Sequence, residues 1–350
     1  MMPAQPDKSP STTIIILNWN GLEDTIECLQ SIYNLDYDNF SVVVVDNASD
    51  KDPSQILKEN FPTITVIRNQ ENIGYAGGNN VGIQYALTQN VEYVWLLNND
   101  ATVEPNTLRK LIHTAEQNKT AGLLSPLIRD YQNQDEIQAC GGYLNWDTFE
   151  FGMLNSPDAW MAELNAGCAY LWGTALLIRR SVIEDIGLLD QKYFAYTEDR
   201  QYCYRALRKG YSLILDTHTN IYHKWAQASG GDLDSPGKVF LMTRNNYFFW
   251  MENLRSMDKI RFLRRYLLRS IQSRLKFEEN NKMAVVRQIN RAIWYALRNK
   301  GGGPDECGEI PGWANSLFFN HPYFWRNLLD GNYRTIAASL KNKLIKPFSR

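Results

Sequence analysis

The first hundred residues alternate short apolar segments, rich in β-branched side chains, with segments of helical periodicity. The apolar segments span residues 14–17, 42–45, 64–67 and 93–97, and further strands are expected at 171–178, 212–215 and 221–223. Short apolar segments are typical of parallel strands buried on both faces. The helical segments between them would supply the crossover connections that parallel strands need. The alternation therefore predicts an α/β fold with a mostly parallel, Rossmann-like sheet flanked by helices.

Polar clusters follow three of these strands at the points where the strands are expected to end. The clusters are Asn18-Trp19-Asn20, Asp46-Asn47-Ala48-Ser49 and Asn98-Asn99-Asp100. In an open parallel sheet, ligands bind in the crevice beyond the carboxyl ends of the strands. The sequence therefore predicts that the three clusters contribute to one site.

Composition limits the class of protein. With 44% hydrophobic residues, 21% charged residues and a formal net charge of -1, the chain is globular and has no general attraction to nucleic acid. Five scattered cysteines without CxxC spacing favour a reducing compartment over a disulfide framework or a zinc site. No apolar run is long enough to span a bilayer, and residues 1–11 are polar, so we expect a cytoplasmic protein with a disordered N-terminus.

Several of these residues are candidates for binding a donor molecule. Asp100 could hold Mg²⁺, which proteins bind through one or two carboxylates together with substrate phosphates and water; the alternative is a turn residue. Asp46 could accept a hydrogen bond from a nucleobase on which Trp19 stacks, or the two could be a turn residue and a core residue. The glycine-rich segment 72–80 opens a helix and would allow close approach of a phosphate or sugar, although it matches no nucleotide-binding fingerprint.

Glu198 and Asp199 are the best candidates for a general base. They follow Thr197, a predicted N-cap, and begin a helix expected to end before Gly210. Adjacent carboxylates can divide the roles of ionised base and hydrogen-bonding partner. The alternative is a favourable interaction with the helix N-terminus.

Two isolated residues and the C-terminal region are less specific. His223 could bind a metal through a neutral imidazole, and Arg244 could neutralise a phosphate, although each could equally be structural. Residues 251–300 hold 13 Lys and Arg against 4 Asp and Glu. Their helices could bind an anionic membrane, pack in a core or form a homodimer contact. The side chains expected to enter the membrane are Phe262, Tyr266, Leu267, Leu268 and Trp294.

The order of these markers resembles family 2 glycosyltransferases of the GT-A fold, and within them the bacterial rhamnosyltransferase-like branch. The resemblance covers about residues 12–250. It implies a GT-A domain over 12–237 and leaves 238–350 as a helical C-terminal region. It matches residues 15–21 to the first-strand motif, 44–49 to the base-binding motif, 72–79 to the donor-binding loop and 98–100 to the metal-binding element.

The resemblance implies an inverting transfer of rhamnose or a similar hexose from a dTDP- or UDP-linked donor. The acceptor would be a glycan or a polyprenyl-diphosphate-linked sugar, used for cell-surface polysaccharide or glycolipid assembly at the inner face of the membrane. Asp199 would be the base with Glu198 beside it, and Asp100 and His223 would hold Mg²⁺ or Mn²⁺. Trp172 and Gly173 would lie on the acceptor side. The donor residues would be Leu17, Asn18, Trp19, Asn20, Asp46, Asn47, Ser49, Asn72, Gly74, Tyr75, Asn79, Asn98 and Asn99, with Arg244 added for its charge.

The sequence departs from the family pattern at two places, and two alternative functions are also compatible with it. Asn98 replaces the first Asp of the metal-binding element, so cation binding would depend on Asp100 and the diphosphate. Arg200-Gln201-Tyr202 replaces the usual acidic-apolar continuation after the base, which affects the expected acceptor contacts. A sugar nucleotidyltransferase would need a basic loop after the first strand, and residues 18–23 are not basic. A non-catalytic nucleotide-sugar-binding module is the other alternative.

Overall fold

The computed structural model describes residues 9–225 and 234–319. The chain divides into two compact units, Met1–Asp232 and Leu233–Arg350, whereas the sequence predicted a boundary at 237. The backbone N–H of Ser11 donates to Glu92, and the Ser9 carbonyl accepts from Asn39. The disorder predicted for residues 1–11 is therefore wrong for residues 9–11, and residues 1–8 lie outside the described residues.

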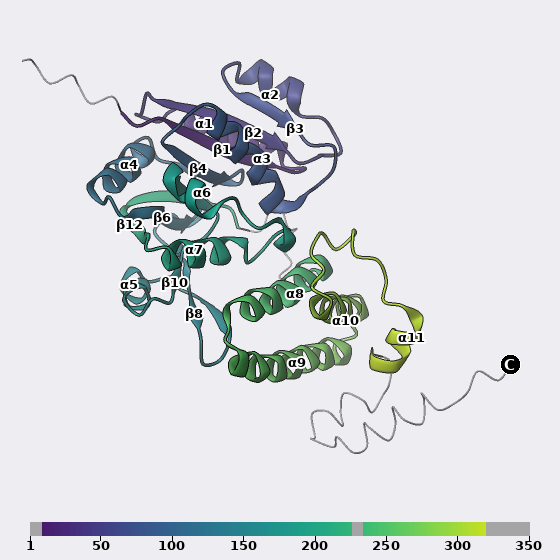
Figure 1. Cartoon of the computed structure of the whole chain (residues 1–350). Coiled ribbons are helices and arrows are strands. Elements are labelled where there is room, and N and C mark those ends of the chain that lie inside the picture. Colours follow the sequence, from purple (N-terminus) through teal and green to yellow (C-terminus); the bar gives the residue numbers. More distant parts are fainter. Residues whose placement is uncertain (1–8, 226–233, 320–350) are drawn as a thin grey trace, which may run out of the picture. The chain divides into compact units, whose positions relative to one another are not determined.

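The N-terminal unit is built on a twisted mixed sheet in which the strands run in the order β3-β2-β1-β4-β11-β6-β12-β5, with β7 beside β6 (Figure 1). A small second sheet has the order β10-β8-β9. The strands are β1 Thr12–Asn18, β2 Phe40–Asp46, β3 Thr65–Arg68, β4 Tyr93–Asn98, β5 Ala101–Val103, β6 Ala121–Asp130, β7 Ile137–Ala139, β8 Gly142–Asn145, β9 Glu150–Met153, β10 Ala169–Tyr170, β11 Ala175–Arg179 and β12 Ser212–His223.

Helices cover both faces of the main sheet. On one face, Leu29 of α1, Leu57 of α2 and Leu111 of α4 pack into a continuous core with Ile14 and Trp95 of the strands. The helices of this unit are α1 Leu22–Ile32, α2 Ser54–Asn60, α3 Gly74–Thr88, α4 Thr107–Gln117, α5 Pro157–Asn165, α6 Arg180–Ile186, the 3₁₀ turn η1 Gln191–Tyr193 and α7 Glu198–Arg208.

Helix α3 lies close against the other face of β1. A Cβ atom at Gly78 would lie 2.3 Å from Leu17 Cδ1, and one at Gly82 would lie 2.5 Å from Ile15 Cγ2. Glycine is needed at both positions because only a residue without a Cβ allows this approach. At Gly78 the space is taken by the Leu17 side chain, which packs on α3, and the donor role of Leu17 stays a prediction.

The predicted parallel strands are confirmed, and the later strands differ in detail. β1 pairs in parallel with β2 and β4, and β2 pairs in parallel with β3. β11 is antiparallel to both β4 and β6 and begins at Ala175 rather than at 171. The two strands predicted at 212–215 and 221–223 form one strand, β12, with an irregularity between Asp216 and Asn220. The fold is thus a mixed α/β fold with a mostly parallel central sheet, as expected.

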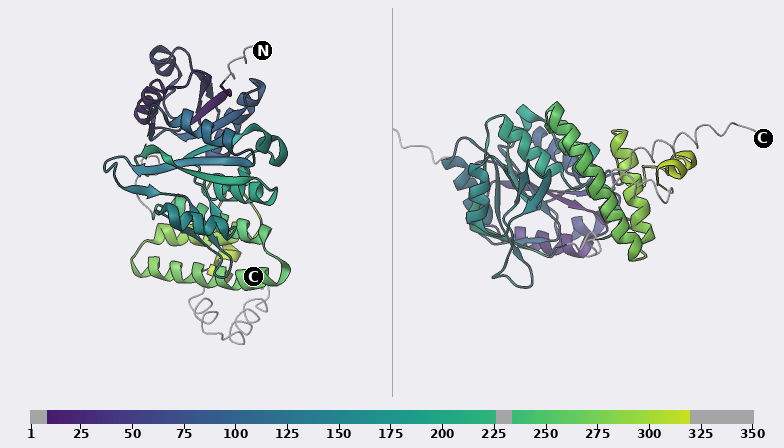
Figure 2. Two further views of the ribbon diagram at one scale, coloured as in Figure 1. Left: turned by 90° about the vertical axis from the view of Figure 1, so that its left-hand side faces the viewer. Right: turned by 90° about the horizontal axis from the view of Figure 1, so that it is seen from below.

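The C-terminal unit consists mainly of helices, of which α8, α9 and α10 lie side by side (Figures 1 and 2). Phe262 and Tyr266 of α9 are only 2% and 6% exposed, so these two side chains belong to the core and the prediction that they enter a membrane is wrong. Among the described residues, no helix is both long and apolar enough to cross a membrane. The elements are α8 Pro236–Asn253, α9 Ser256–Glu279, α10 Met283–Leu297, α11 Gly312–Ala314 and the π-helical turn η2 Asn315–Phe319.

Candidate active site

Asn18 connects the carboxyl ends of β1 and β2 through side-chain hydrogen bonds. The strand register sets Asn18 opposite Asp46. The Asn18 Nδ2 donates to Asp46 Oδ1 at 2.7 Å and to Ser49 Oγ at 3.1 Å, while its Oδ1 accepts from Thr25 Oγ1 at 3.0 Å. All four side chains are buried. Asn18 and Ser49 therefore position the loops around the site, and the predicted donor contacts of these two side chains are not supported.

Asp46 is fully buried and its acceptor positions are filled. Oδ1 accepts from Asn18 and from Ser49 Oγ at 2.5 Å. Oδ2 accepts from the Ser49 N–H at 3.2 Å and forms an ion pair with Arg68 at 2.6 Å. Two donors on each oxygen leave no lone pair for a nucleobase. A base could reach Asp46 only by displacing one of these partners, so the direct contact predicted from the sequence is not supported by this arrangement.

Trp19 is 44% exposed, which shows that its side chain projects from the site and does not fill the core. The next residue, Asn20, has a left-handed φ of 54°, and its N–H donates to Ser49 Oγ at 2.8 Å. This turn holds the indole at the carboxyl ends of the strands. An exposed indole offers a flat face on which a nucleobase can stack.

Asn47 connects the end of β2 to the segment before α3. Its Nδ2 donates to Asn72 Oδ1 at 2.8 Å and to the Gly74 carbonyl at 3.1 Å, and its Oδ1 accepts from Asn69 at 3.0 Å. The Asn72 Oδ1 also accepts from the Gly74 N–H at 2.9 Å. These amides therefore fix the start of α3, whose N-terminus lies beside the ends of β1 and β2.

Asp100 and His223 meet because β5 and β12 pair with His223 opposite Ala101. His223 Nε2 lies 3.1 Å from Asp100 Oδ1, and both side chains are buried. On the other side of the ring, Nδ1 lies 2.7 Å from Oε1 of Gln138. The neighbouring Asn99 donates to Thr25 Oγ1 at 3.1 Å. Asn99 is thus a structural residue, and its predicted donor contact is not supported.

The Asp100–His223 pair fits a divalent cation. If the Nδ1 proton is donated to the amide oxygen of Gln138, a neutral His223 directs the Nε2 lone pair at the Asp100 carboxylate. Two acceptors so close together repel each other unless a proton or a cation lies between them. Within residues 9–225 and 234–319, no three His, Cys, Asp or Glu side chains gather around one point. A cation at this pair would therefore also need phosphate oxygens or water, as Mg²⁺ commonly does.

Glu198 and Asp199 start α7 as predicted, and the helix ends before Gly210. Thr197 occupies the N-cap position as predicted, with a left-handed φ of 83° and no capping hydrogen bond from its side chain. Burial, followed by the charge of Asp199, raises the pKa of Glu198 to about 8. Burial thus favours the protonated form of Glu198.

Tyr75 brings the two halves of the site together. Its hydroxyl donates to the Gly173 carbonyl at 2.7 Å, and the Gly173 N–H donates to Asp199 Oδ2 at 3.1 Å. A Cβ at Gly173 would lie 3.0 Å from the Tyr75 hydroxyl. Burial, and then the charges of Glu198, Asp199 and Asp100, raise the pKa of Tyr75. Hydrogen bonds therefore join the predicted base to Tyr75 through Gly173, although Tyr75 and Gly173 are 98 residues apart in the chain.

Aromatic rings lie on the predicted acceptor side. The ring of Trp172 is 5.7 Å from that of Trp225, and the Trp225 ring is 6.5 Å from that of His223. Trp225, Gln138 and Arg68 were not among the residues predicted from the sequence. Of these three, only Trp225 could have been suspected from the sequence, because it lies two residues after His223. The acceptor role of Trp172 and Gly173 stays a prediction.

Three predicted donor residues have other surroundings. Asn79 is buried in α3, where its Nδ2 donates to the Tyr75 carbonyl at 2.9 Å. The Asn98 N–H donates to the Thr174 carbonyl at 2.8 Å, which joins β4 to the start of β11. Arg244 is fully buried in the C-terminal unit, where its guanidinium donates to the Gly302 carbonyl at 2.6 Å. These contacts do not support the predicted phosphate contact of Arg244.

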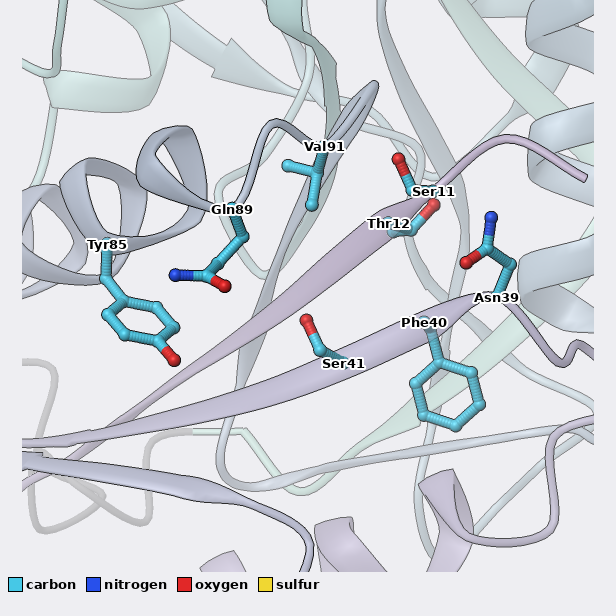
Figure 3. Close-up of a pocket in the computed structure, with 8 residues that line it drawn as sticks. All are labelled: Ser11, Thr12, Asn39, Phe40, Ser41, Tyr85, Gln89 and Val91. Atoms are coloured by element: carbon cyan, nitrogen blue, oxygen red, sulfur yellow. The ribbon is translucent and has the colours of Figure 1, made fainter.

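A hollow of about 250 Å³ lies at the opposite, amino ends of β1 and β2 (Figure 3). Its walls include Thr12, Ser41, Tyr85 and Gln89. It contains no carboxylate, histidine or cysteine, and none of the predicted site residues. The candidate active site is therefore the cluster at the carboxyl ends of the strands.

Comparison with known proteins decides the family. Residues 13–187, half of the chain, match the family model described as Glycosyl transferase family 2. The chain belongs to glycosyl transferase family 2. The resemblance seen in the sequence is thereby confirmed.

Relatives of this glycosyltransferase extend beyond the family domain. The low-salt glycan biosynthesis hexosyltransferase Agl10 of Haloferax volcanii is 28% identical over 84% of this chain and 93% of the relative. The N-acetylglucosaminyl-diphospho-decaprenol L-rhamnosyltransferase of Mycobacterium tuberculosis is 26% identical over 55% of this chain and 69% of the relative. The solved mannosyltransferase PcManGT of Pyrobaculum calidifontis has a TM-score of 0.52 at 18% identity, covering 98% of this chain and 89% of that one, and thus shares the fold.

Proposed function

We propose that this glycosyltransferase moves a hexosyl residue, with rhamnose the first candidate, from a pyrimidine nucleoside diphosphate sugar to an acceptor hydroxyl with inversion. The observation that carries the proposal is the hydrogen-bonded link from Asp199 through Gly173 to Tyr75, which joins the start of α7 to the N-terminus of α3. A hexosyltransferase of glycan biosynthesis and a rhamnosyltransferase acting on a decaprenol-linked sugar are among its relatives. These names support a glycan or polyprenyl-diphosphate-linked acceptor in cell-surface polysaccharide or glycolipid assembly.

Asp199 is the group that takes the acceptor proton. The Gly173 N–H and the Arg200 N–H each donate to one of its oxygens, at 3.1 and 2.8 Å, and this fixes the carboxylate while leaving a second lone pair on each oxygen. Burial favours the protonated form of Glu198 and so reduces the negative charge beside Asp199. A base held in this way contributes about 10²–10⁴-fold to the rate.

The donor is held at the carboxyl ends of the strands. Trp19 stacks on the nucleobase, and Asp100 with His223 would hold Mg²⁺ or Mn²⁺ against the diphosphate. When bound, the cation supplies charge compensation for the departing diphosphate. The family and fold favour transfer of a sugar over a nucleotidyltransferase reaction. Release of nucleoside diphosphate that depends on an acceptor would exclude a non-catalytic binding module.

We expect uridine or thymidine diphosphate sugars to stabilise the protein in the presence of Mn²⁺. A ligand at 100 times its Kd adds about 2.7 kcal/mol to the free energy of unfolding. Thermal unfolding with uridine, thymidine and guanosine diphosphate sugars, with and without Mn²⁺, measures this directly. Trp19→Ala should lose most of the stabilisation, whereas Trp313→Ala, at another exposed tryptophan, should keep it. Stabilisation by guanosine diphosphate sugars alone would contradict the pyrimidine specificity.

We further propose that α9 contacts an anionic membrane surface, which would hold the enzyme at the inner face of the cell membrane. Met257 and Ile260 are 74% and 66% exposed, and Arg264 and Arg265 follow one turn later on the exposed side of the same helix. Apolar side chains beside arginines suit a membrane interface, where each charge contributes about 1 kcal/mol. Met257 and Ile260, instead of Phe262 and Tyr266, are thus the apolar side chains expected to contact the membrane.

We expect the protein to sediment with liposomes containing anionic lipid at low salt and to be released at high salt. The double variant Met257→Ser/Ile260→Ser and the charge reversal Arg264→Glu should each weaken binding. Arg287→Glu on α10, at an exposed arginine paired with Glu309, is the control. Unchanged binding of all variants would contradict the proposal. Light scattering at the same concentrations separates this surface from a homodimer contact.

A further inference from the structure

We infer that Gln138 sets the tautomer of His223 and thereby keeps Nε2 available for a divalent cation shared with Asp100. The inference deepens the proposed function, because it rests on the cation site suggested there. Gln138 lies at the centre of β7, which is antiparallel to β6, and β6 pairs with β12, the strand that ends at His223. Sheet pairing thus sets a glutamine beside a histidine 85 residues later in the chain.

The orientation of the Gln138 amide follows from its two contacts with His223. One end of the amide lies 3.1 Å from the His223 carbonyl oxygen, and the other end lies 2.7 Å from the ring Nδ1. A backbone carbonyl only accepts hydrogen bonds, so the NH₂ group must face it. Oε1 therefore faces Nδ1, and a hydrogen bond there requires the proton to be on Nδ1.

Asp100 favours the opposite tautomer. Its Oδ1 lies 3.1 Å from Nε2, so a neutral imidazole next to Asp100 alone would be stabilised with its proton on Nε2. That tautomer has its lone pair on Nδ1, on the side of the ring away from the carboxylate. It could not bind a cation together with Asp100. Gln138 opposes this preference by accepting the proton at Nδ1, as partners of metal-binding histidines commonly do.

Other contacts fix the backbone around Asp100 and His223. The specific effect of Gln138 is therefore on the position of the imidazole proton. His223 pairs with Ala101 across β12 and β5, and its carbonyl also accepts from the Tyr131 N–H at 3.2 Å. The Lys224 N–H donates to the Asp100 carbonyl at 3.0 Å. The Trp225 ring meets the imidazole edge-on and offers no acceptor. Loss of the Gln138 side chain would leave the ring in place and free its proton to move.

Two variants separate the tautomer from simple packing. Gln138→Leu removes both contacts, whereas Gln138→Glu keeps an acceptor for Nδ1–H and removes the donor to the His223 carbonyl. Long-range ¹H–¹⁵N spectra of the imidazoles, recorded with Mg²⁺ and UDP and again without them, report which nitrogen carries the proton. The chain has only four histidines, and His223→Gln identifies the signals. Binding of Mn²⁺ in the presence of UDP, followed by electron paramagnetic resonance, is the second measurement.

We expect Nδ1 of His223 to be protonated in the wild type and in Gln138→Glu, and the proton to move to Nε2 in Gln138→Leu. The affinity for Mn²⁺ should fall about 10- to 100-fold in Gln138→Leu, as for other partners of metal-binding residues, and much less in Gln138→Glu. Gln117→Leu is a matched control. Gln117 and His113 form a second glutamine–histidine pair, at 2.8 Å on the surface of α4, so this variant should change only the His113 signals.

Three results would overturn the inference. An Nε2–H tautomer in the wild type would show that Gln138 does not determine the proton position. Equal losses in Gln138→Leu and Gln138→Glu would assign Gln138 a structural role through the His223 carbonyl. A changed tautomer with unchanged Mn²⁺ affinity would remove the link to cation binding. A different result would count only against the cation site of the proposed function. In that case the proton on Nδ1 would still depend on Gln138, but the protein would not bind Mn²⁺.

Discussion

Asp199→Asn is expected to lower the rate of sugar transfer at least about 100-fold, the smaller end of what a positioned base contributes. The asparagine amide has the shape of the carboxylate but cannot take the acceptor proton. It can still accept one of the two hydrogen bonds that Asp199 receives from Gly173 and Arg200, so the loop before β11 should keep its position. Initial rates of nucleoside diphosphate release with a matched donor and acceptor measure the loss.

Donor binding distinguishes loss of the base from loss of the fold. Because no predicted donor contact involves Asp199, the variant should bind UDP with Mn²⁺ nearly as the wild type does. Asp185→Asn, at a surface residue paired with Lys209, is the matched control and should transfer sugar normally. A rate for Asp199→Asn within about threefold of wild type would remove Asp199 from the role of base, since a positioned base contributes far more.

Asp100→Ala is expected to abolish the part of donor binding that depends on a metal ion. The variant removes the carboxylate of the Asp100–His223 pair, and among the described residues no third acidic, histidine or cysteine side chain lies near enough to replace it. His223→Ala should have a smaller effect, because the negative charge that attracts the cation remains. Calorimetric titration of UDP with and without Mn²⁺ measures both variants.

The matched control for this prediction is Asp135→Ala, in the exposed turn before β7. It should bind UDP and Mn²⁺ as the wild type does. If chelator-treated wild-type protein binds the donor and transfers sugar at full rate without added metal, the cation site is wrong. In that case the Asp100–His223 contact is an ion pair within the protein, and the transfer must proceed without charge compensation from a cation.

The location of the site was predictable because it depends on local properties of the chain. β1, β2 and β4 are recognisable from their apolar residues alone, and parallel strands bring the residues that follow them to one edge of the sheet. The start of α7 at Glu198 and its end before Gly210 also follow from neighbouring residues. The order of these markers identified the family.

Strand direction and the roles of individual polar residues were not predictable in this way. β11 is as apolar as a parallel strand, but it runs antiparallel between β4 and β6, and an apolar pattern does not encode direction. Asp46 has the sequence context of a base-binding carboxylate. Its oxygens are filled by Ser49, Asn18 and Arg68, of which only Ser49 is a near neighbour in the chain.

The sequence by itself determined the α/β fold class, the edge of the sheet where the candidate site lies, and the candidate base and cation ligand. These features depend on apolar periodicity and on the polar residues that follow each strand, and both involve only residues that are close together in the chain. Only the tertiary structure decided that Asp199 is linked through Gly173 to Tyr75, that Glu198 has a raised pKa, and that Gln138 contacts His223. The physical reason is that hydrogen-bond partners and burial depend on sheet register, which joins residues far apart in the chain.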